Sequence, residues 1–234
     1  MTLCFATGSI YRMYKSLDKQ IERIKRFNFD GIELTLGKVK QLRKFKLKQS
    51  AIKYLRTLKY NSVHAPFGHN FKNTTRSRNL LKKIEEIASL INAKHINFHP
   101  HKIKHYDDIL NMRFKATIEN MEKGAGVKSA ALKKIFRKHP KLGYVLDTTH
   151  PTMYSVNKIG KLYRLFKNKL TAVHLSGAIK GKLHQPLSLC SKALIEELKF
   201  IKKLKVPIII EENFGPGEKG ILEKEIKFIR EMLE

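Results

Sequence analysis

Short apolar runs alternate with longer amphipathic stretches along the chain. The short runs are rich in Ile, Val and Leu, as is typical of buried parallel strands, and the longer stretches have the period of a helix. We expect strands at Leu3–Ala6, Gly31–Leu36, Ser62–Ala65, His95–His99, Ala116–Glu119, Gly143–Asp147, Thr171–Leu175 and Val206–Glu211. Strands that alternate with helices predict a parallel sheet joined by right-handed crossovers.

Residues that favour helix starts stand before several of the amphipathic stretches. The predicted helices run from Ser16 towards Arg26, from Ser77 towards Leu90, from Ser155 towards Phe166, from Ser191 towards Leu204, and from Gly220 to Leu233. The pattern is weakest at Lys38–Leu58 and at Tyr106–Phe114.

Two arrangements of such a sheet fit the pattern, a closed barrel and an open doubly wound sheet, and periodicity alone does not separate them. No Gly-rich phosphate loop follows the first strand, and polar residues recur at the end of nearly every strand rather than at one switch point. That recurrence is typical of an active site at one mouth of a barrel. We therefore predict a single (β/α)8 TIM-barrel domain over residues 1–234.

Imidazole and carboxylate groups stand at the carboxyl ends of six predicted strands. They are His64, His99, Glu119, Asp147, His150, His174, His184 and Glu211, with His101 nearby. Each one alone is more often a hydrogen-bonded core or rim residue. In a closed barrel they must converge, and converging carboxylates without a cation raise one another's pKa values. We therefore predict bound divalent metal, with zinc or manganese suited to these donors, over the alternative of a hydrogen-bonded polar core.

The charge balance points to an anionic partner. The chain has 48 Lys and Arg against 20 Asp and Glu, a formal net charge of +28. From Lys38 to Lys59 there are nine basic residues and no acid. Single basic clusters are usually solvated helix faces, but an excess of this size over a whole chain destabilises it unless a polyanion compensates. Nucleic acid is the partner we expect, although basic proteins also bind other anions.

The remaining composition indicates a cytoplasmic protein. Cys4 and Cys190 are widely separated, so we expect no disulfide and two small hydrophobic side chains. No apolar run approaches the ~20 residues that span a bilayer, and Met1–Ala6 lacks the pattern of a signal peptide. We expect no membrane partner and a monomer.

The strand ends resemble the endonuclease IV family of abasic-site DNA nucleases, within the wider group of xylose-isomerase-like barrels. The resemblance extends from the third predicted strand to the eighth. It rests on Asn97-Phe98-His99-Pro100, on Ile118-Glu119-Asn120 followed by Gly124 and Gly126, and on Leu146-Asp147-Thr148-Thr149-His150. It implies a trinuclear zinc cluster that binds the phosphodiester beside an abasic site.

The resemblance also implies a role for each ligand. Glu119 would bridge two metals, with His64 and His99 completing the first. Asp147, His174 and Glu211 would complete the second. The third would use His150 and His184 with an aspartate two residues before His184. Lys182 stands there, and Pro186-Leu187-Ser188 replaces the usual Gly-Glu-Gly, so we expect two metal sites and leave the third open.

On this reading the protein is a metal-dependent phosphodiesterase of abasic or damaged DNA. The metals would polarise a phosphoryl oxygen and convert bound water to hydroxide, with Glu119 and Glu211 as the catalytic carboxylates. Phe67 would wedge into the duplex at the lesion, where unstacking costs least. The residues expected to contact the DNA backbone are Lys38, Lys40, Arg43, Lys44 and Lys182.

The main alternative is a sugar or sugar-phosphate isomerase or epimerase on the same scaffold. Such an enzyme needs one metal, held here by Asp147 and His174, and Glu119 and Glu211 to move protons. The loss at Lys182 does not affect it, but it leaves the two histidines of the first site and the charge of +28 unexplained. We therefore favour the nuclease, with a non-catalytic nucleic-acid binder as a third hypothesis.

Overall fold

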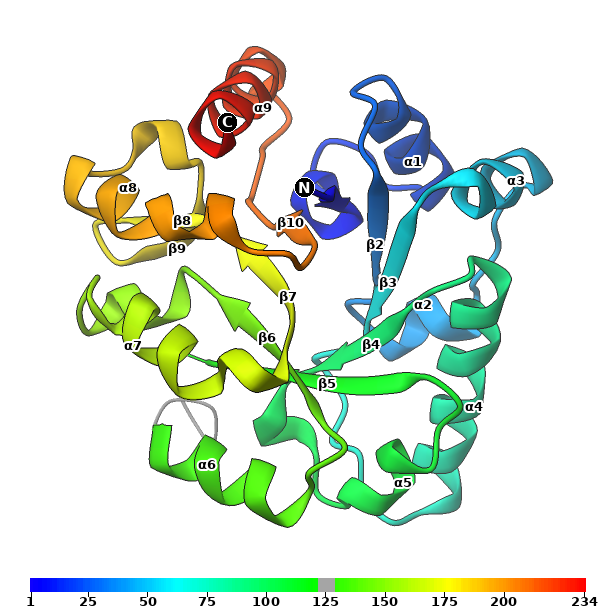
Figure 1. The fold of residues 1–234 in the computed structure, drawn as a ribbon. Helices are drawn as coiled ribbons and strands as arrows, with labels where there is room; N and C mark the ends of the chain where they lie inside the picture. The colour runs from blue at the N-terminus through cyan, green and yellow to red at the C-terminus, as the bar shows by residue number, and fades with distance from the viewer. Residues whose placement is uncertain (122–128) are drawn as a thin grey trace.

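The computed structural model describes residues 1–121 and 129–234 and contains a closed parallel barrel (Figure 1). Its strands are β1 (Leu3–Ala6), β2 (Gly31–Thr35), β3 (Tyr60–His64), β4 (His95–Phe98), β5 (Lys115–Glu119), β6 (Gly143–Asp147), β7 (Leu170–Leu175) and β10 (Ile208–Ile210). The order around the barrel is β1-β10-β7-β6-β5-β4-β3-β2, and every neighbouring pair is parallel. The prediction of a (β/α)8 barrel is confirmed, and each predicted strand is present within about two residues.

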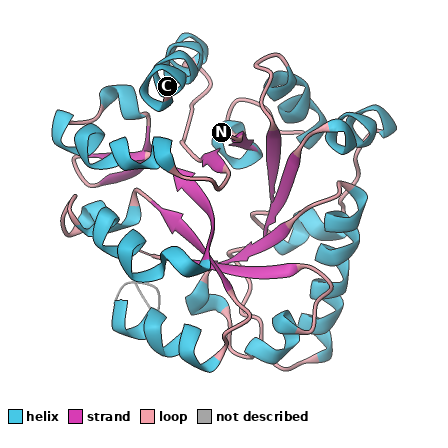
Figure 2. Ribbon diagram, in the orientation of Figure 1, coloured by secondary structure: helices cyan, strands magenta, loops and turns pink. Residues whose placement is uncertain are grey.

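Helices surround the barrel on its outside (Figure 2). They are α1 (Leu17–Lys25), α2 (Val39–Arg43), α3 (Gln49–Thr57), α4 (Thr75–Leu90), α5 (Tyr106–Leu110), α6 (Ser129–Lys138), α7 (Lys158–Phe166), α8 (Lys192–Leu198) and α9 (Lys219–Leu233). Short 3₁₀ turns are η1 (Thr7–Ile10), η2 (Pro100–Lys102), η4 (His150–Met153), η5 (Lys167–Lys169), η6 (Leu187–Leu189) and η7 (Lys199–Lys203). The apolar sides of these helices pack on the sheet, where one large buried cluster includes Phe5, Ile32 and Leu146.

Some predicted helix starts are wrong by a few residues. Helix α4 begins at Thr75 because the Thr74 side chain accepts the Ser77 backbone N–H, so Thr74 and not Ser77 is the cap. Helix α7 begins at Lys158, and Asn157 rather than Ser155 occupies its cap position. The Ser191 side chain caps α8 as predicted.

A two-stranded hairpin, β8 (Gly177–Ile179) and β9 (Lys182–Gln185), follows β7 and was not predicted. Its two-residue turn, Lys180-Gly181, has φ values of 47° and 77°. Positive φ at both positions is the hairpin turn that matches strand twist, and Gly181 adopts it without steric cost. The hairpin lies at the carboxyl end of β7 and carries His184 and Lys182.

One part of the barrel interior is apolar. Cys4, Ala6, Val145, Ala172 and Ile209 form a small buried apolar cluster from β1, β6, β7 and β10.

Both cysteines are free thiols. Within the described residues, no helix is long and apolar enough to cross a membrane.

Candidate metal centre

The rest of the barrel interior is polar. Strands β2 to β5 contribute buried side chains whose register brings them to the same level: Glu33 pairs with Ser62, and Asn97 with His64 and Thr117. Such groups are costly inside a protein unless each has a partner. Their partners are one another and the ionisable side chains at the strand ends.

The first ligand group combines His64, His99 and Glu119, whose donor atoms lie within 4.8 Å of one another. Glu119 Oε1 lies 2.8 Å from His99 Nε2 and 3.6 Å from His64 Nε2. The Asn97 amide donates to the other oxygen, Oε2, at 3.1 Å. The structure therefore brings together the three residues that the resemblance assigns to the first metal.

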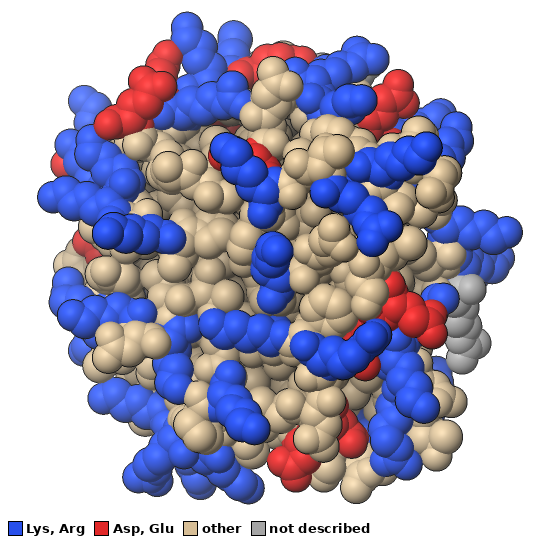
Figure 3. All heavy atoms as spheres, turned by 45° about the vertical axis from the view of Figure 1, so that its right-hand side comes forward, with Lys and Arg blue, Asp and Glu red and all other residues tan. Residues whose placement is uncertain are grey.

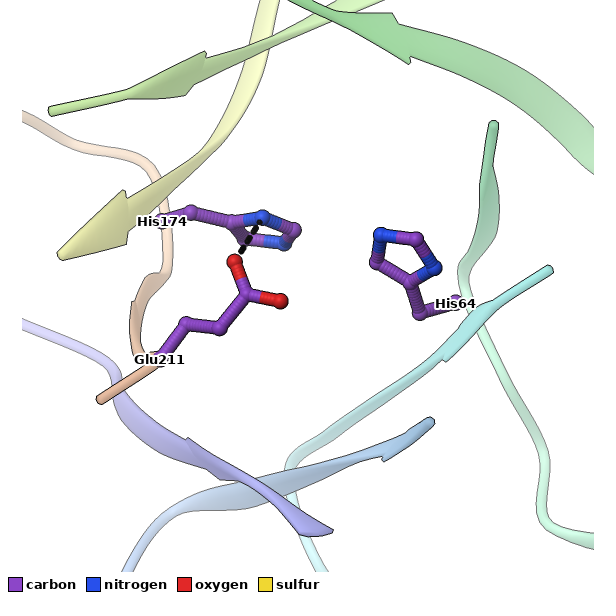
Figure 4. A group of neighbouring side chains, drawn as sticks. All are labelled: His64, His174 and Glu211. Carbon is purple, nitrogen blue, oxygen red and sulfur yellow. Dashed lines mark ion pairs between the residues drawn. The ribbon is translucent and has the colours of Figure 1, made fainter. Parts of the chain in front are cut away.

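The second group combines Glu119, Asp147, His174 and Glu211 within the same distance. His174 Nδ1 lies 2.8 Å from Glu211 Oε2 and 3.1 Å from Glu119 Oε2. His64 also joins His174 and Glu211 in an overlapping group, and Figure 4 shows these three side chains pointing toward one another across the barrel from β3, β7 and the segment after β10. Glu119 thus belongs to both groups, with one oxygen toward each.

The third group combines Asp147, His150 and His184. The two imidazole rings meet edge to face with centroids 5.2 Å apart. Lys182 is exposed at the start of β9, and Asp147 supplies the carboxylate of this group. His184 has a φ of 54°, in the left-handed region, where a non-glycine residue is strained. Two hydrogen bonds hold its backbone there: the His184 N–H donates to Thr149 Oγ1, and the His184 carbonyl accepts the Asn213 N–H.

The segment after His184 is fixed by two buried carboxyl groups. Glu225 accepts the backbone N–H of Leu187 at 2.8 Å, and Glu212 accepts it at 3.1 Å. Burial, and then the nearby Glu225, raise the pKa of Glu212 well above its usual range. Pro186-Leu187-Ser188 therefore serves as the anchor of the hairpin.

Three of the histidines are oriented in the same way. The Nδ1 atoms of His64, His150 and His184 lie 2.9, 2.8 and 3.0 Å from the backbone carbonyls of Ala65, Asn120 and Glu211. An imidazole that donates Nδ1–H to a carbonyl presents the Nε2 lone pair on its other side. Metal-binding histidines in proteins are held in this way.

Without a cation, the charges of the inner residues balance one another. Burial opposes ionisation of Glu119, but His99 and the nearby imidazoles of His174 and His64 lower its pKa well below the usual range. Burial likewise opposes ionisation of Glu211, yet His174 lowers its pKa to about 2. Burial disfavours the charged imidazole of His64, and Glu119 nevertheless raises its pKa to about 9. The directions of these pKa shifts favour charged carboxylates in Glu119 and Glu211 beside the protonated imidazole of His64.

The donor set fits a divalent cation. One oxygen of Asp147, Oδ1, accepts the backbone N–H groups of Thr149 and His150 at 2.8 and 2.9 Å. The other, Oδ2, is buried and has no hydrogen-bond partner among the described residues. Burial, against the pull of His150 and His184, raises the pKa of this carboxyl. A buried carboxylate oxygen that lacks a donor and faces imidazole nitrogens suits zinc or manganese.

Comparison with known proteins identifies solved structures that share the fold of this chain. No protein-family model and no curated protein matches the chain. A D-tagatose 3-epimerase-like protein is 20% identical with a TM-score of 0.64, covering 100% of both chains. Endonuclease IV from Thermus thermophilus is 17% identical with a TM-score of 0.71, covering 99% of this chain and 100% of that one. A probable 3-DHS dehydratase from Bacillus anthracis is 14% identical with a TM-score of 0.73, covering 98% and 99%.

These three structures share the fold of this chain, a closed (β/α)8 barrel. At these identities the likeness extends to the fold, and barrels of this kind carry different chemistries on the loops at their carboxyl end. The endonuclease is one of several structures that are about equally similar.

The residues expected to contact DNA lie in different places. Lys40 and Lys44 line a pocket of about 440 Å³ with Val39 and Arg76. Lys38 and Lys182 are exposed. The side chain of Arg43, and Gly124 and Gly126 of the resemblance, lie outside the described residues. Because α2 follows β2 and Arg76 is in the first turn of α4 after β3, the pocket lies on the metal-centre side of the barrel.

Phe67 and His101 flank the first ligand group. The ring of Phe67 stacks on His99 with centroids 5.9 Å apart and meets His64 edge-on. The side chain is 44% exposed, so it forms part of the wall of the site and is open to a substrate. The ring centroids of His101 and His99 lie 5.5 Å apart, and His101 is in none of the ligand groups found in the described residues.

Sequence reasoning missed Glu33. It is fully buried in β2, and its Oε1 lies 3.1 Å from His174 Nε2. The available signal was an acidic residue in the middle of the apolar run Gly31–Leu36, where the alternation of a strand gives it the same facing as Gly31 and Thr35.

Proposed function

We propose that this protein is a metal-dependent phosphodiesterase, similar to endonuclease IV, that cleaves abasic or damaged DNA. The observation that carries the proposal is the sharing of Glu119 between two ligand groups. Two cations about 3.5–4 Å apart, held by a common carboxylate, are the arrangement with which many enzymes act on phosphodiesters. His99 has no role in a one-metal site formed by Glu119, Asp147, His174 and Glu211, and this proposal accounts for it.

The exposed edge of the cluster indicates where a substrate enters. The side chains of His99 and Glu211 are 17% and 18% exposed, whereas those of Glu119 and His174 are 1% and 0% exposed. Bound divalent cations would supply polarisation of a phosphoryl oxygen and activation of a water molecule. The chain holds the ligand atoms in place through Asn97 and the backbone carbonyls, so little reorganisation is needed when the substrate binds.

The surface charge supports a polyanionic substrate. The net charge is +28, and Figure 3 shows Lys and Arg over much of the face on which the right-hand elements of Figure 1 come forward, with few acids between them. The pocket at Lys40, Lys44 and Arg76 would take a backbone phosphate beside the metal centre. A small sugar substrate gives no reason for so large an excess of positive charge.

An isomerase or epimerase remains the second candidate because one group is sufficient for it. Glu119, Asp147, His174 and Glu211 together form a complete four-residue site with two carboxylates available for proton transfer. This candidate predicts one functional cation and activity that survives loss of His99.

The test uses a DNA duplex that contains one synthetic abasic site. We expect the zinc- or manganese-loaded protein to cut the strand at the lesion, and a chelator or Glu119→Ala to abolish cutting. Glu86→Ala, a change of the same kind at an exposed glutamate of α4, serves as the control and should cut normally. Absence of incision by the metal-loaded protein, together with epimerisation of a ketose, would contradict the proposal.

A further inference from the structure

Glu33 occupies an unusual position for a carboxylate. It lies in the middle of β2, between Ile32 and Leu34, with a side chain that is 0% exposed. It is not a member of any ligand group found in the described residues, so the proposed cations do not account for it. A fully buried carboxylate is retained at a high cost in desolvation unless its partners compensate.

Its partners are one hydroxyl group and one imidazole. Ser62 Oγ donates a hydrogen bond to Glu33 Oε2 at 2.8 Å. The other oxygen, Oε1, lies 3.1 Å from His174 Nε2. The Ser62 hydroxyl thus fixes the carboxylate so that Oε1 faces the imidazole.

His174 faces carboxylates on both sides of its ring. Its Nε2 faces Glu33, and its Nδ1 lies within 3.1 Å of Glu119 and 2.8 Å of Glu211. A cation bound to one nitrogen of an imidazole leaves the proton on the other nitrogen. A hydrogen-bond acceptor beside that second nitrogen stabilises this tautomer.

From this geometry we infer that Glu33 is a positioning residue that keeps the proton on His174 Nε2 and so directs Nδ1 to the second ligand group. The inference rests on the proposed metal centre. A carboxylate that receives the second N–H of a metal-binding histidine fixes the tautomer and ring orientation and makes the ligand more basic. The Nδ1 atoms of His64, His150 and His184 face backbone carbonyls, whereas the partner of His174 Nε2 is a side chain that can be changed.

The experiment measures zinc affinity at fixed pH by competition with a chromophoric chelator, and the visible spectrum of the cobalt-loaded protein. We expect Glu33→Ala to weaken one site by roughly 10- to 100-fold and to change its cobalt spectrum. Glu33→Gln, whose carbonyl still accepts Nε2–H, should restore part of the affinity. Ser62→Ala should have a smaller effect in the same direction.

A cycle with His174→Ala separates positioning from general damage to the barrel. If Glu33 acts through His174, adding Glu33→Ala to His174→Ala should cause no further loss of affinity. Asn61→Ala is the matched control. It removes buried hydrogen bonds to Leu55, Ile91 and the Ile32 backbone on the side of β3 opposite to Ser62, and should lower stability without changing zinc affinity.

The outcomes are distinct. Normal zinc affinity and a normal cobalt spectrum in folded Glu33→Ala would overturn the positioning role. A wild-type chain that binds no divalent metal would overturn it together with the proposed function. Weakened binding in Glu33→Ala, in a protein that does not cut abasic DNA, would support the role of Glu33 and contradict only the nuclease proposal.

Discussion

The inner ligand groups, centred on Glu119, and the outer group of Asp147, His150 and His184 are built in different ways. The inner side chains come from strands or the residues just after them and are oriented largely by carboxylate–imidazole pairs. The outer imidazoles come from the turn η4 and the hairpin β8–β9 and are oriented by backbone carbonyls. One carboxylate, Asp147, serves both regions.

This difference implies unequal affinity for cations. The inner region has three acidic ligands, Glu119, Asp147 and Glu211, whereas the outer has only the shared Asp147 for two imidazoles. The number of acidic ligands largely sets the electrostatic attraction for a divalent ion. We therefore expect the inner sites to fill first and the outer site to be the weak one.

The largest expected effect contrasts the loss of an inner ligand with the loss of an outer one. His174→Ala should reduce incision of abasic DNA on the order of 10²- to 10³-fold or more, because it opens the second inner group. His184→Ala should reduce it on the order of 10-fold and leave inner-site metal in place. Single-turnover incision rates and metal analysis of both variants measure the contrast. Equal losses of incision rate in the two variants would contradict the prediction.

The next effect tests where the charged inner network ends. His95 lies at the start of β4 and contacts the Tyr60 hydroxyl through Nδ1 at 2.8 Å. Burial lowers its pKa to about 4, from 6.5. As the pH falls below 6.5, His95 becomes protonated in the unfolded chain, whereas in the folded chain it stays neutral down to about pH 4. The free energy of unfolding therefore falls as the pH is lowered through this interval.

His95→Gln should remove this term. Between about pH 7 and pH 5 the wild-type protein should lose about 2 kcal/mol more stability than the variant, measured by urea unfolding with chelator present. If the free energy of unfolding changed with pH in the same way in both proteins, His95 would be charged in the folded state. The charged network around Glu119 would then extend as far as His95.

A smaller effect follows from adding an acid to the outer group. Lys182→Asp should raise zinc affinity at the third site by roughly 10-fold or more, since it replaces an ammonium by a carboxylate two residues before His184. Lys180→Asp makes the same charge change at an exposed turn position that tolerates positive φ, and it should have little effect. Equal gains from the two variants would mean that the effect is general electrostatics.

The smallest effect concerns the basic pocket. Lys40→Glu and Lys44→Glu should each weaken binding to undamaged and abasic duplex alike, and reduce the slope of log K against log salt by about one. Lys224→Glu on α9 is the control for net charge. A change in lesion preference, instead of a uniform loss, would place these lysines nearer the reacting phosphate than the fold implies.

Much of the fold and of the ligand set could be predicted from the sequence because both depend on short-range patterns. Apolar runs identify the strands, and a polar residue at a strand end necessarily faces the barrel mouth, which is how His64, Glu119 and Asp147 were found. The pairing of Asp147 with His150 and His184 depends on the turn η4 and the hairpin, and neither has a strong local signal.

Glu33 and α6 show two further limits. Glu33 stands inside a strand, where an acid usually faces solvent, and only barrel closure makes it interior. Helix α6 (Ser129–Lys138) has a helical period, but its Lys- and Arg-rich face obscures the apolar one, which consists of buried residues such as Leu132 and Phe136. Basic composition of this kind informs function more than secondary structure.

The central claim is that Glu119 joins two cation sites, and manganese titration followed by EPR tests it most directly. The account predicts at least two manganese ions per chain, with a spin-coupled signal that appears as the second ion binds and disappears in Glu119→Ala. A single bound ion per chain, with the spectrum of an isolated ion throughout the titration, would contradict it.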